Sequence, residues 1–474
     1  MGHREETKVS EAELLIQKQF IEKVKKINEQ FEKENNRKKK MFISTYGCQM
    51  NARDSEKLDG MLKEMGYINA ENEQDSDFII YNTCCVRENA ENKVYGNLGY
   101  LKSAKEKNPN LRIALCGCMM QQDTVIETIK KTYRHVDIVF GTFNLYKFPE
   151  LIYTNIETNE PVFDVWKEHK EIIEDLPSIR KHSFKASVNI MFGCNNFCSY
   201  CIVPYVRGRE RSRKSEDIIK EIKELVADGV IEIMLLGQNV NSYGKGLEEN
   251  IDFAGLLRKV NEIDGLERIR FMTSHPKDLS DELIYAMRDC EKVCNYLHLP
   301  FQAGNNEVLR NMRRNYTKEH YLGLIEKLKK EIPNIALTTD IIVGFPGETS
   351  EQVDDTIDVI KKVKFNGAFT FIYSKRTGTP AAKMEVTATD EQIKKDFNRV
   401  LEVLNPIIYD LNKEKIGKKF KVLAEGYSQD EEFITGRTED NSLVHFKAGM
   451  RDIIGKIVEV EITDCKTFYL IGQL

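Results

Sequence analysis

Short apolar runs alternate with longer amphipathic stretches along most of the chain, which indicates parallel β-strands joined by helices. In the first part of the chain we predict four strands, at Phe42–Thr45, Phe78–Asn82, Ile113–Cys116 and Val136–Phe140. After residue 185 the same pattern predicts six more, at Ser187–Phe192, Glu232–Leu236, Arg268–Met272, Tyr296–Leu299, Ala336–Val343 and Ala368–Tyr373. The first group predicts a small parallel α/β domain, and the second predicts a partial parallel (β/α)6 barrel.

The charged segment 1–40 does not follow this alternation. Its apolar residues recur at spacings of 4, 3 and 4 and therefore share one helical face: Phe20, Val24, Ile27 and Phe31. We predict an amphipathic helix here, closed by the basic run Arg37–Lys40. The pattern leaves open whether this extension is a solvated helix with a hinge or an arm that contacts RNA.

The segment 413–474 alternates apolar and polar positions between glycine-containing turns, which predicts a small antiparallel β-barrel. The apolar positions are Val422/Ala424, Val444/Phe446, Val458/Val460/Ile462 and Tyr469/Ile471. Five lysines gather where this segment begins: Lys413, Lys415, Lys418, Lys419 and Lys421. Barrels of this kind bind RNA or stabilise a neighbouring domain as a cap, and the pattern alone does not choose between the two.

Residues 158–185 are charged, lack periodicity and contain Pro161 and Pro177, which predicts a linker. We therefore predict five segments. They are a charged helical extension (1–40), an α/β domain (41–157), the linker (158–185), the barrel core (186–410) and the small β-barrel (413–474). A chain of 474 residues has room for about two to four domains, in agreement with this division.

Composition limits the possible partners and the compartment. Seventy basic and 75 acidic side chains give a net charge of −5, so contact with a nucleic acid must come from local basic patches. No run of 18 apolar residues occurs and no apolar signal-peptide core follows Met1, so we expect a cytoplasmic protein with no membrane span. Eleven cysteines in a reducing compartment favour metal or redox chemistry over a disulfide framework.

Three of these cysteines lie within eight residues, as Cys194, Cys198 and Cys201 in the spacing C-x3-C-x2-C. A [4Fe–4S] cluster held by three cysteines keeps one iron open for an outside ligand, such as a substrate or a cofactor. A zinc site needs four ligands, and no nearby Cys or His in the sequence completes one. We therefore predict an iron–sulfur cluster with an open iron, the alternative being a zinc knuckle or a set of buried thiols.

Three further cysteines come directly after predicted strands: Cys48, Cys84 and Cys118. Ligands gather outside the carboxyl ends of the strands of an open parallel sheet, so these thiols should converge at one edge. We predict a second iron–sulfur cluster there, although buried thiols are again the alternative. We assign Cys85 and Cys116, which adjoin the proposed ligands, to packing.

Polar residues also follow the strands of the predicted barrel, where barrel active sites lie. They are Gly237-Gln238-Asn239, Ser274-His275, Gln302 and Gly344-Phe345-Pro346-Gly347-Glu348. Directly after the three-cysteine motif, Arg207, Arg209, Arg211 and Arg213 alternate with other residues. Such a run suits RNA phosphates, which guanidinium groups bind in a bidentate manner. The alternative is an ion-pair network with Glu210, Glu216 and Asp217.

Together these motifs give the chain a close resemblance to the radical-SAM (S-adenosylmethionine) methylthiotransferases, over about residues 41–474. The resemblance is carried by Thr45-Tyr46-Gly47-Cys48-Gln49-Met50-Asn51, Asn82-Thr83-Cys84, Val86-Arg87-Glu88, Gly117-Cys118, the three-cysteine motif, Pro204-Tyr205-Val206-Arg207-Gly208-Arg209-Glu210-Arg211-Ser212-Arg213 and Thr339–Thr349. One departure is Ala303, where the family usually has Ser, and the extension 1–40 is another. The resemblance implies an N-terminal domain with an auxiliary cluster, a radical-SAM partial barrel and a C-terminal TRAM domain that binds RNA.

The resemblance also implies the chemistry. Cys194, Cys198 and Cys201 would hold the [4Fe–4S] cluster that binds and cleaves SAM, and the resulting radical abstracts hydrogen from the substrate. Cys48, Cys84 and Cys118 would hold the auxiliary [4Fe–4S] cluster, which donates a sulfur methylated by a second SAM. Tyr200 would approach the adenine of SAM, or else form an apolar lid over the cluster. Gln238 and Asn239 are further candidate SAM contacts.

The Arg-rich motif resembles that of the subgroup that modifies carbon 2 of N6-isopentenyladenosine beside the anticodon of tRNA, with Arg207, Arg209 and Arg211 as RNA contacts. Relatives that modify threonylcarbamoyladenosine or a ribosomal-protein aspartate share the cysteines. The implied partners are tRNA, a low-potential electron donor of the flavodoxin or ferredoxin type, and a sulfur source. A non-catalytic iron–sulfur sensor that binds RNA is the alternative from another functional class.

Overall fold

The computed structural model describes residues 9–474, except 86–87, 169–170, 173, 175, 430, 448 and 450–451. Val86 and Arg87 of the Val86-Arg87-Glu88 motif, and the first eight residues of the extension, therefore lie outside the described residues. The chain forms two compact units. The first comprises Met1–Lys181, Met191–Asn195 and Ile202–Arg213, and the second comprises His182–Ile190, Asn196–Cys201 and Lys214–Leu474.

The first unit is built on a six-stranded parallel sheet with strand order β2-β1-β3-β4-β5-β6. Its strands are β1 (Lys40–Thr45), β2 (Ile68–Asn69), β3 (Phe78–Thr83), β4 (Arg112–Gly117), β5 (Ile138–Phe140) and β6 (Val162–Asp164). The four predicted strands are confirmed as β1, β3, β4 and β5. Every residue of the central strand β3 is buried, which agrees with its apolar sequence.

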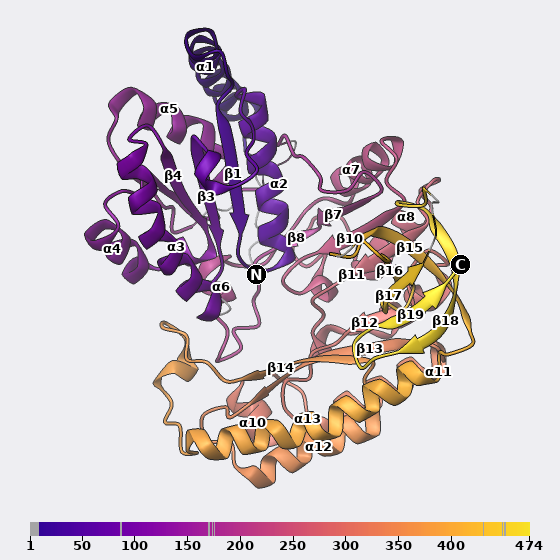
Figure 1. Cartoon of the computed structure of the whole chain (residues 1–474). Coiled ribbons are helices and arrows are strands. Elements are labelled where there is room, and N and C mark those ends of the chain that lie inside the picture. The colour runs from indigo at the N-terminus through magenta and orange to yellow at the C-terminus, as the bar shows by residue number, and fades with distance from the viewer. Residues whose placement is uncertain are drawn as a thin grey trace. The chain divides into compact units, whose positions relative to one another are not determined.

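Helices cover both faces of this sheet (Figure 1). They are α1 (Glu11–Asn35), α2 (Gln49–Glu64), α3 (Glu88–Lys107), α4 (Asp123–Thr132) and α5 (Phe148–Thr158), with short 3-10 turns η1 (Glu73–Asp75), η2 (Cys118–Gln121) and η3 (Leu145–Lys147). Alternate residues of β3 enter different hydrophobic clusters, because side chains along a strand point to opposite faces. Phe78 and Ile80 join the cluster that includes α1, whereas Ile79 and Tyr81 join the other.

The predicted amphipathic helix of the extension is confirmed as α1, but its buried face differs by a small rotation. The fully buried positions are Gln17, Ile21, Val24 and Asn28, and the predicted Phe20, Ile27 and Phe31 flank this stripe as half-buried residues. The basic run forms ion pairs with carboxylates of the first unit, to which it belongs. Arg37 donates to both carboxylate oxygens of Asp77, at 2.6 and 2.8 Å, and Lys40 pairs with Asp75 at 2.5 Å. These contacts favour a structural extension over an RNA-binding arm.

The prediction of a linker over the segment 158–185 is partly wrong. Val162–Asp164 forms β6, the edge strand of the sheet, and pairs in parallel with β5. Ile172 further along is buried, and the backbone of Pro177 packs so closely on Gly60 of α2 that a Cβ there would lie 2.6 Å from the Pro177 carbonyl carbon. A three-residue edge strand flanked by proline and charged residues carries too short a pattern to be recognised from sequence.

The second unit contains the predicted parallel strands in two three-stranded sheets, β11-β10-β7 and β12-β13-β14. Their bounds are β7 (Lys185–Asn189), β10 (Glu232–Leu236), β11 (Arg268–Phe271), β12 (Tyr296–His298), β13 (Ala336–Val343) and β14 (Gly367–Ile372). A parallel bridge between Ile269 and Val293 links the chain next to β12 with β11. The partial barrel is confirmed. One predicted strand divides, because β8 (Met191–Phe192) leaves β7 and pairs antiparallel with β9 (Arg211–Ser212) in the first unit.

Helices connect the strands of the partial barrel, and Figure 1 shows α12 and α13 running beside each other. The helices are α7 (Ser215–Ala227), α8 (Phe253–Asn261), α9 (Asp281–Asp289), α10 (Asn306–Asn311), α11 (Lys318–Glu331), α12 (Ser350–Val363) and α13 (Asp390–Lys413), with 3-10 turns η4 (Val240–Ser242), η5 (Pro276–Asp278) and η6 (Pro380–Lys383). The short helix α6 (Val203–Val206) belongs to the first unit. Several of these helices begin with a side-chain cap, such as the capping box of Thr349 and Gln352 at α12.

The C-terminal segment forms a closed barrel with strand order β15-β16-β17-β19-β18. The strands are β15 (Lys419–Tyr427), β16 (Ile434–Thr438), β17 (Leu443–Lys447), β18 (Ile457–Cys465) and β19 (Leu470–Gln473), and all pairs are antiparallel except β17 with β19. Leu470 and Gly472 face the core, so the predicted inward positions Tyr469 and Ile471 are wrong by one residue. Since the side-chain period is two, a one-residue slip moves the whole strand to the other face.

Two buried arginines of β11 fix this barrel to the partial barrel within the second unit. Arg268 donates to the carbonyl oxygens of Arg437 and Lys421, at 3.0 and 2.8 Å. Arg270 donates to those of Glu439 and Thr438, at 3.0 and 2.6 Å. Arg270 also pairs with the buried carboxylate of Glu232 on β10 at 3.0 Å. The barrel is therefore attached through its own backbone.

Candidate functional site

Cys48, Cys84 and Cys118 lie at the carboxyl ends of the neighbouring strands β1, β3 and β4. Asn51 in the first turn of α2 is completely buried, and its Oδ1 lies 3.6 Å from Cys48 Sγ and 3.8 Å from Cys118 Sγ. The backbone of Gly47 packs against Cys84, where an added Cβ would lie 3.1 Å from the Cys84 sulfur. The structure thus brings the three thiols to the Gly47–Asn51 segment at one edge of the sheet.

Two asparagines hold this segment in place. Asn51 Nδ2 donates to the carbonyl oxygen of Thr83 at 2.9 Å and to Asn82 Oδ1 at 3.2 Å. In return, Asn82 Nδ2 donates to the carbonyl oxygen of Asn51 at 2.8 Å and to Ser55 Oγ at 3.0 Å. Gly117, before Cys118, has a φ of +92° and passes so near Thr83 that only glycine fits. The motif residues around the cysteines therefore serve to position them.

A buried guanidinium completes this site. Arg207 is 6% exposed, and its Nε donates to Cys118 Sγ at 3.1 Å while its Nη2 donates to Asn51 Oδ1 at 2.9 Å. Arg207 also forms an ion pair with Asp54 at 2.8 Å. A hydrogen bond from Cys85 and the nearby charge of Arg207 lower the pKa of the Cys118 thiol to about 6, against the effect of burial.

The surroundings of Arg207 correct one sequence-based assignment, and those of Cys85 add to another. The arginine run predicts that Arg207 contacts RNA phosphates, but this residue is buried and paired with Asp54, because alternation in such a run does not reveal which arginine points inward. Cys85 and Cys116 pack in the two hydrophobic clusters, as predicted. Cys85 has an additional role, since its thiol hydrogen-bonds to Cys118.

The chemistry of this site fits an iron–sulfur cluster. Among the described residues, no set of three or more His, Cys, Asp or Glu side chains is already arranged around a common metal position. The three thiols nevertheless converge, and at Cys118 the surroundings favour the thiolate, which is the form that binds iron. Arg207 adds a positive charge beside Cys118, where it would face the anionic ligands of a cluster.

The C-x3-C-x2-C motif is shared by the two units. Cys194 follows β8 in the first unit, and its N–H donates to the Gly208 carbonyl oxygen at 3.2 Å. Cys198 and Cys201 belong to the second unit, where Ser199 anchors their loop. Ser199 N and Oγ donate to the carbonyl oxygens of Met312 and Asn311, at 3.0 and 2.7 Å.

A second buried arginine, which sequence reasoning missed, lies against this motif in the second unit. Arg314 Nη1 lies 3.5 Å from Cys198 Sγ, and its Nη2 donates to the Pro300 carbonyl oxygen at 2.8 Å. Arg313 and Asn315 on either side both have a φ of +57°, a strained conformation that turns Arg314 inward. No spacing signal in the sequence marks this residue.

The mouth of the partial barrel carries buried polar atoms that lack hydrogen-bond partners among the described residues. These atoms are Asn239 Oδ1, Nδ2 and Oδ1 of Asn241, Ser274 Oγ and His275 Nε2. Two neighbours at strand ends, Thr273 and Gln302, have positive φ values of 72° and 68°. Unpaired buried polar groups are costly, and with strained backbone they are typical of a ligand site. The mouth therefore fits a polar cofactor such as SAM.

The two other predicted SAM contacts, Tyr200 and Gln238, are half-buried in the second unit. Tyr200 packs against an apolar cluster that consists of Ala303, Val308, Leu309, Met312, Phe345 and Ala381. This packing agrees with the alternative of an apolar lid, and contact with adenine stays a prediction. Asn239 donates from Nδ2 to Asp278 at 2.7 Å, which orients its unpaired Oδ1.

Glu348, in the loop after β13, makes the stability of the protein depend on pH. Burial raises its pKa to about 7, although the N–H groups of Gly344 and Phe345 donate to it. Because the folded-state pKa exceeds the unfolded value of 4.5, the contribution of Glu348 to stability is complete below pH 4.5 and is lost as pH rises through 7. We expect Glu348→Gln to stabilise the protein relative to wild type by about 3 kcal/mol more at pH 8 than at pH 4.5.

Thermal unfolding of both proteins across this pH range measures the effect. The matched control is Glu351→Gln, at the exposed start of α12, whose difference from wild type should change little over the same range. A constant difference between Glu348→Gln and wild type would contradict the buried-carboxyl assignment.

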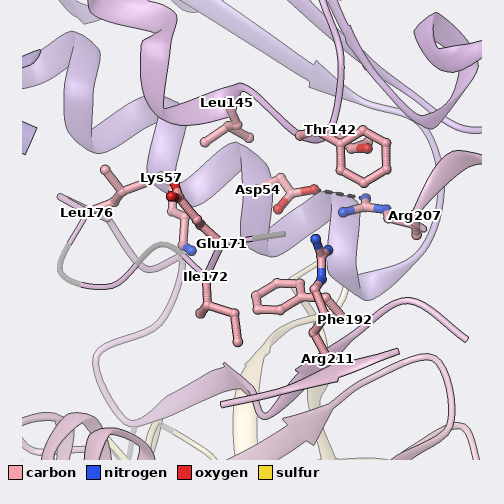
Figure 2. A pocket seen from close by; sticks show the side chains of 11 residues that line it. Asp54, Lys57, Thr142, Leu145, Glu171, Ile172, Leu176, Phe192, Arg207 and Arg211 are labelled. Atoms are coloured by element: carbon pink, nitrogen blue, oxygen red, sulfur yellow. Dashed lines mark ion pairs between the residues drawn. The ribbon is translucent and has the colours of Figure 1, made fainter. Parts of the chain in front are cut away.

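The remaining arginines of the run have different surroundings. Arg209 is exposed, and Arg213 is buried and paired with Glu174 at 2.5 Å. Arg211 lines a pocket of the first unit that encloses about 560 Å³ of space, part of it open to solvent (Figure 2). Its guanidinium lies 5.9 Å from the centre of the Phe143 ring, which also lines this pocket. Two arginines of the run thus form ion pairs with Asp54 and Glu174. The network predicted with Glu210, Glu216 and Asp217 stays a prediction.

The lysines at the start of the small barrel also divide into two groups. Lys415 is buried and pairs with Asp440 at 2.5 Å, and Lys419 pairs with Glu459 at 3.0 Å. Lys413, Lys418 and Lys421 are exposed. In the described part of the chain, no helix combines the length and apolar character that crossing a membrane requires.

Comparison with known proteins places these features in a family. The profile of the Radical SAM superfamily matches residues 188–360, that of Uncharacterized protein family UPF0004 matches 40–141, and that of the TRAM domain matches 413–474. The tRNA-2-methylthio-N(6)-dimethylallyladenosine synthase of Clostridioides difficile (strain 630) is 56% identical over all of this chain and 99% of its own. The chain belongs to this synthase family.

Two further family members confirm the assignment. The synthase of Acetivibrio thermocellus is 56% identical over 98% of this chain and 97% of its own, and that of Clostridium perfringens (strain 13 / Type A) is 58% identical over 93% and 99%. Among solved structures, the radical S-adenosylmethionine methyltransferase TsrM from Kitasatospora setae has a TM-score of 0.53 at 13% identity. The match covers 73% of this chain and 75% of the TsrM chain. At this level of identity, the likeness shows the fold alone.

The matched ranges agree with the sites described above. The UPF0004 range includes Cys48, Cys84 and Cys118. The Radical SAM range includes Cys194, Cys198 and Cys201. The cofactors of this synthase family are [4Fe–4S] clusters and SAM. The closed barrel is the TRAM domain.

Proposed function

We propose that the protein methylthiolates carbon 2 of N6-isopentenyl(dimethylallyl)adenosine next to the anticodon in tRNA. The observation that carries this proposal is similarity to the synthases over the full chain, which includes both three-cysteine sites. Hydrogen at an aromatic carbon is too strongly bound for any side chain to remove, so a cofactor has to act. When bound, the two clusters and two SAM supply the radical and the methylated sulfur.

The residues of this chain would bind and orient these groups. Cys194, Cys198 and Cys201 would hold the SAM-binding cluster, and the mouth residues Gln238 and Asn239, with Tyr200, would contact SAM. Cys48, Cys84 and Cys118 would hold the auxiliary cluster. The unpaired Asn239 Oδ1 supports the first part, and the convergence of thiols around Asn51 supports the second.

For the RNA, we propose Arg209 and Arg211 as contacts beside the reacting base, and the exposed Lys413, Lys418 and Lys421 as contacts of the TRAM barrel. Exposure of Arg209 and the place of Arg211 on an open pocket support this assignment. A low-potential electron donor of the flavodoxin or ferredoxin type and a sulfur source for the auxiliary cluster are the further partners. The reaction would take place in the cytoplasm, where tRNA is available.

The substrate is tested with anticodon stem-loops that differ in one nucleotide. Reconstituted protein with SAM and a reductant should methylthiolate the stem-loop that carries N6-isopentenyladenosine, as measured by mass spectrometry of the digested nucleosides. The same RNA with unmodified adenosine or threonylcarbamoyladenosine, and a ribosomal-protein peptide, are the controls. Preference for either of the last two would move the protein to a sister subgroup. Absence of any SAM cleavage would favour the iron–sulfur sensor instead.

A further inference from the structure

Arg207 is the point at which the arginine run meets the auxiliary cysteines. Its contacts with Cys118, Asn51 and Asp54 lie within the first unit. Its Nε reaches the sulfur of Cys118 at 3.1 Å, and its Nη2 reaches both Asn51 Oδ1 at 2.9 Å and Asp54 at 2.8 Å. The guanidinium thus connects one proposed cluster ligand to the residue around which the thiols gather.

The charges around this position are of opposite sign and both are close to the thiols. Arg207 is buried, and the Asp54 side chain is only 11% exposed. Figure 2 shows Asp54 and Arg207 pointing toward each other in the lining of the pocket, with Lys57 one turn further along α2. In such a poorly solvated position, a charge interacts with its neighbours much more strongly than it does in water.

We propose that Arg207 is a positioning residue that holds the auxiliary cluster and raises its reduction potential, and that Asp54 limits this effect. The inference rests on the proposed function, since it assumes that Cys48, Cys84 and Cys118 hold that cluster. Reduction potentials of iron–sulfur clusters depend on net charge and on hydrogen bonds to sulfur. A guanidinium that donates to a ligand sulfur supplies both.

The sign of each contribution follows from electrostatics. Reduction adds an electron to the cluster, so a nearby positive charge stabilises the reduced form and a nearby negative charge destabilises it. Removing Arg207 should therefore lower the potential, and removing the charge of Asp54 should raise it. If Arg207 and Asp54 only supported the fold, their replacement would not shift the reduction potential in opposite directions.

The test is an anaerobic redox titration followed by electron paramagnetic resonance. It uses the full chain with Cys194, Cys198 and Cys201 replaced by alanine, so that the auxiliary cluster alone contributes. At a fixed solution potential, Arg207→Met should lower the ratio of reduced to oxidised cluster about tenfold, a shift of about 59 mV for one electron. Asp54→Asn should raise the ratio, and Arg207→Lys, which keeps the charge, should shift it less than Arg207→Met does.

Arg213→Met is the matched control, because Arg213 is buried in the same segment but pairs with Glu174. It should leave the ratio within about twofold of the parent. The proposal is overturned if Arg207→Met keeps its iron without a shift, or if Asp54→Asn fails to raise the ratio. Should Arg207→Met lose its iron, the sign of the Asp54→Asn shift decides. If the parent protein holds no cluster at these cysteines, the proposed function itself fails.

Discussion

Replacing Cys48, Cys84 and Cys118 together with alanine is expected to abolish methylthiolation while SAM cleavage continues. On the proposed assignment, generation of the radical would require only the cluster at Cys194, Cys198 and Cys201, whereas the sulfur would come from the auxiliary site. The iron content should fall from about eight to about four per chain, the difference of one cubane cluster. Iron analysis, 5′-deoxyadenosine formation and nucleoside mass spectrometry measure the three quantities.

Cys116→Ala is the appropriate control for this variant. Cys116 is buried in the hydrophobic cluster beside the site, so its replacement should leave both iron and product unchanged. Cys85 is less suitable, since its thiol contacts Cys118. Product formation by the triple variant would refute the role of these cysteines in sulfur donation.

Arg270→Met should destabilise the second unit by about 3–5 kcal/mol, because it leaves the buried carboxylate of Glu232 without its closest partner. The substitution also removes two hydrogen bonds to the carbonyl oxygens of Thr438 and Glu439 in the TRAM barrel. We therefore expect the barrel to become sensitive to proteolysis at lower denaturant concentrations than in the wild type. Thermal unfolding and limited proteolysis measure the two effects.

A double variant separates the two contributions of this arginine. Arg270→Met with Glu232→Leu removes the carboxylate that the single variant leaves with Arg268, at 3.8 Å, as its ion-pair partner. It should recover part of the loss, since replacing both members of a buried pair is far less costly than removing one. The sensitivity of the barrel to proteases should persist, because its carbonyl oxygens still lack donors. An Arg270→Met protein as stable as wild type would show that the pair does not hold the barrel.

Much of the fold could be predicted because its signals are local and repeated. The strands β10 and β13 begin and end where the apolar runs do, and the rule that ligands gather at the carboxyl ends of parallel strands located the cysteines correctly on the sheet. These inferences depend only on periodicity and order along the chain. The same reasoning assigned Cys116 to the core.

The predictions that failed depend on tertiary contacts. The sequence of β6 is too short to show alternation, and the pairing of β8 with β9 joins residues about twenty positions apart through a turn that contains the cysteine motif. The inward direction of Arg207 depends on Asp54, and the strain that orients Arg314 arises from two neighbours with positive φ. The register of β19 is seen only in its pairing, which places Leu470 opposite the buried Val444 and Gly472 opposite the buried Phe446 of β17.

The first unit is not continuous in sequence, and this has a consequence for biogenesis. A nascent chain that has emerged only as far as Lys181 lacks the β8–β9 pair and Arg207. The auxiliary thiols can therefore reach their final surroundings only after the C-x3-C-x2-C motif has also left the ribosome. A fragment that ends at the first contiguous segment would thus be an incomplete scaffold for the auxiliary cluster proposed at these thiols.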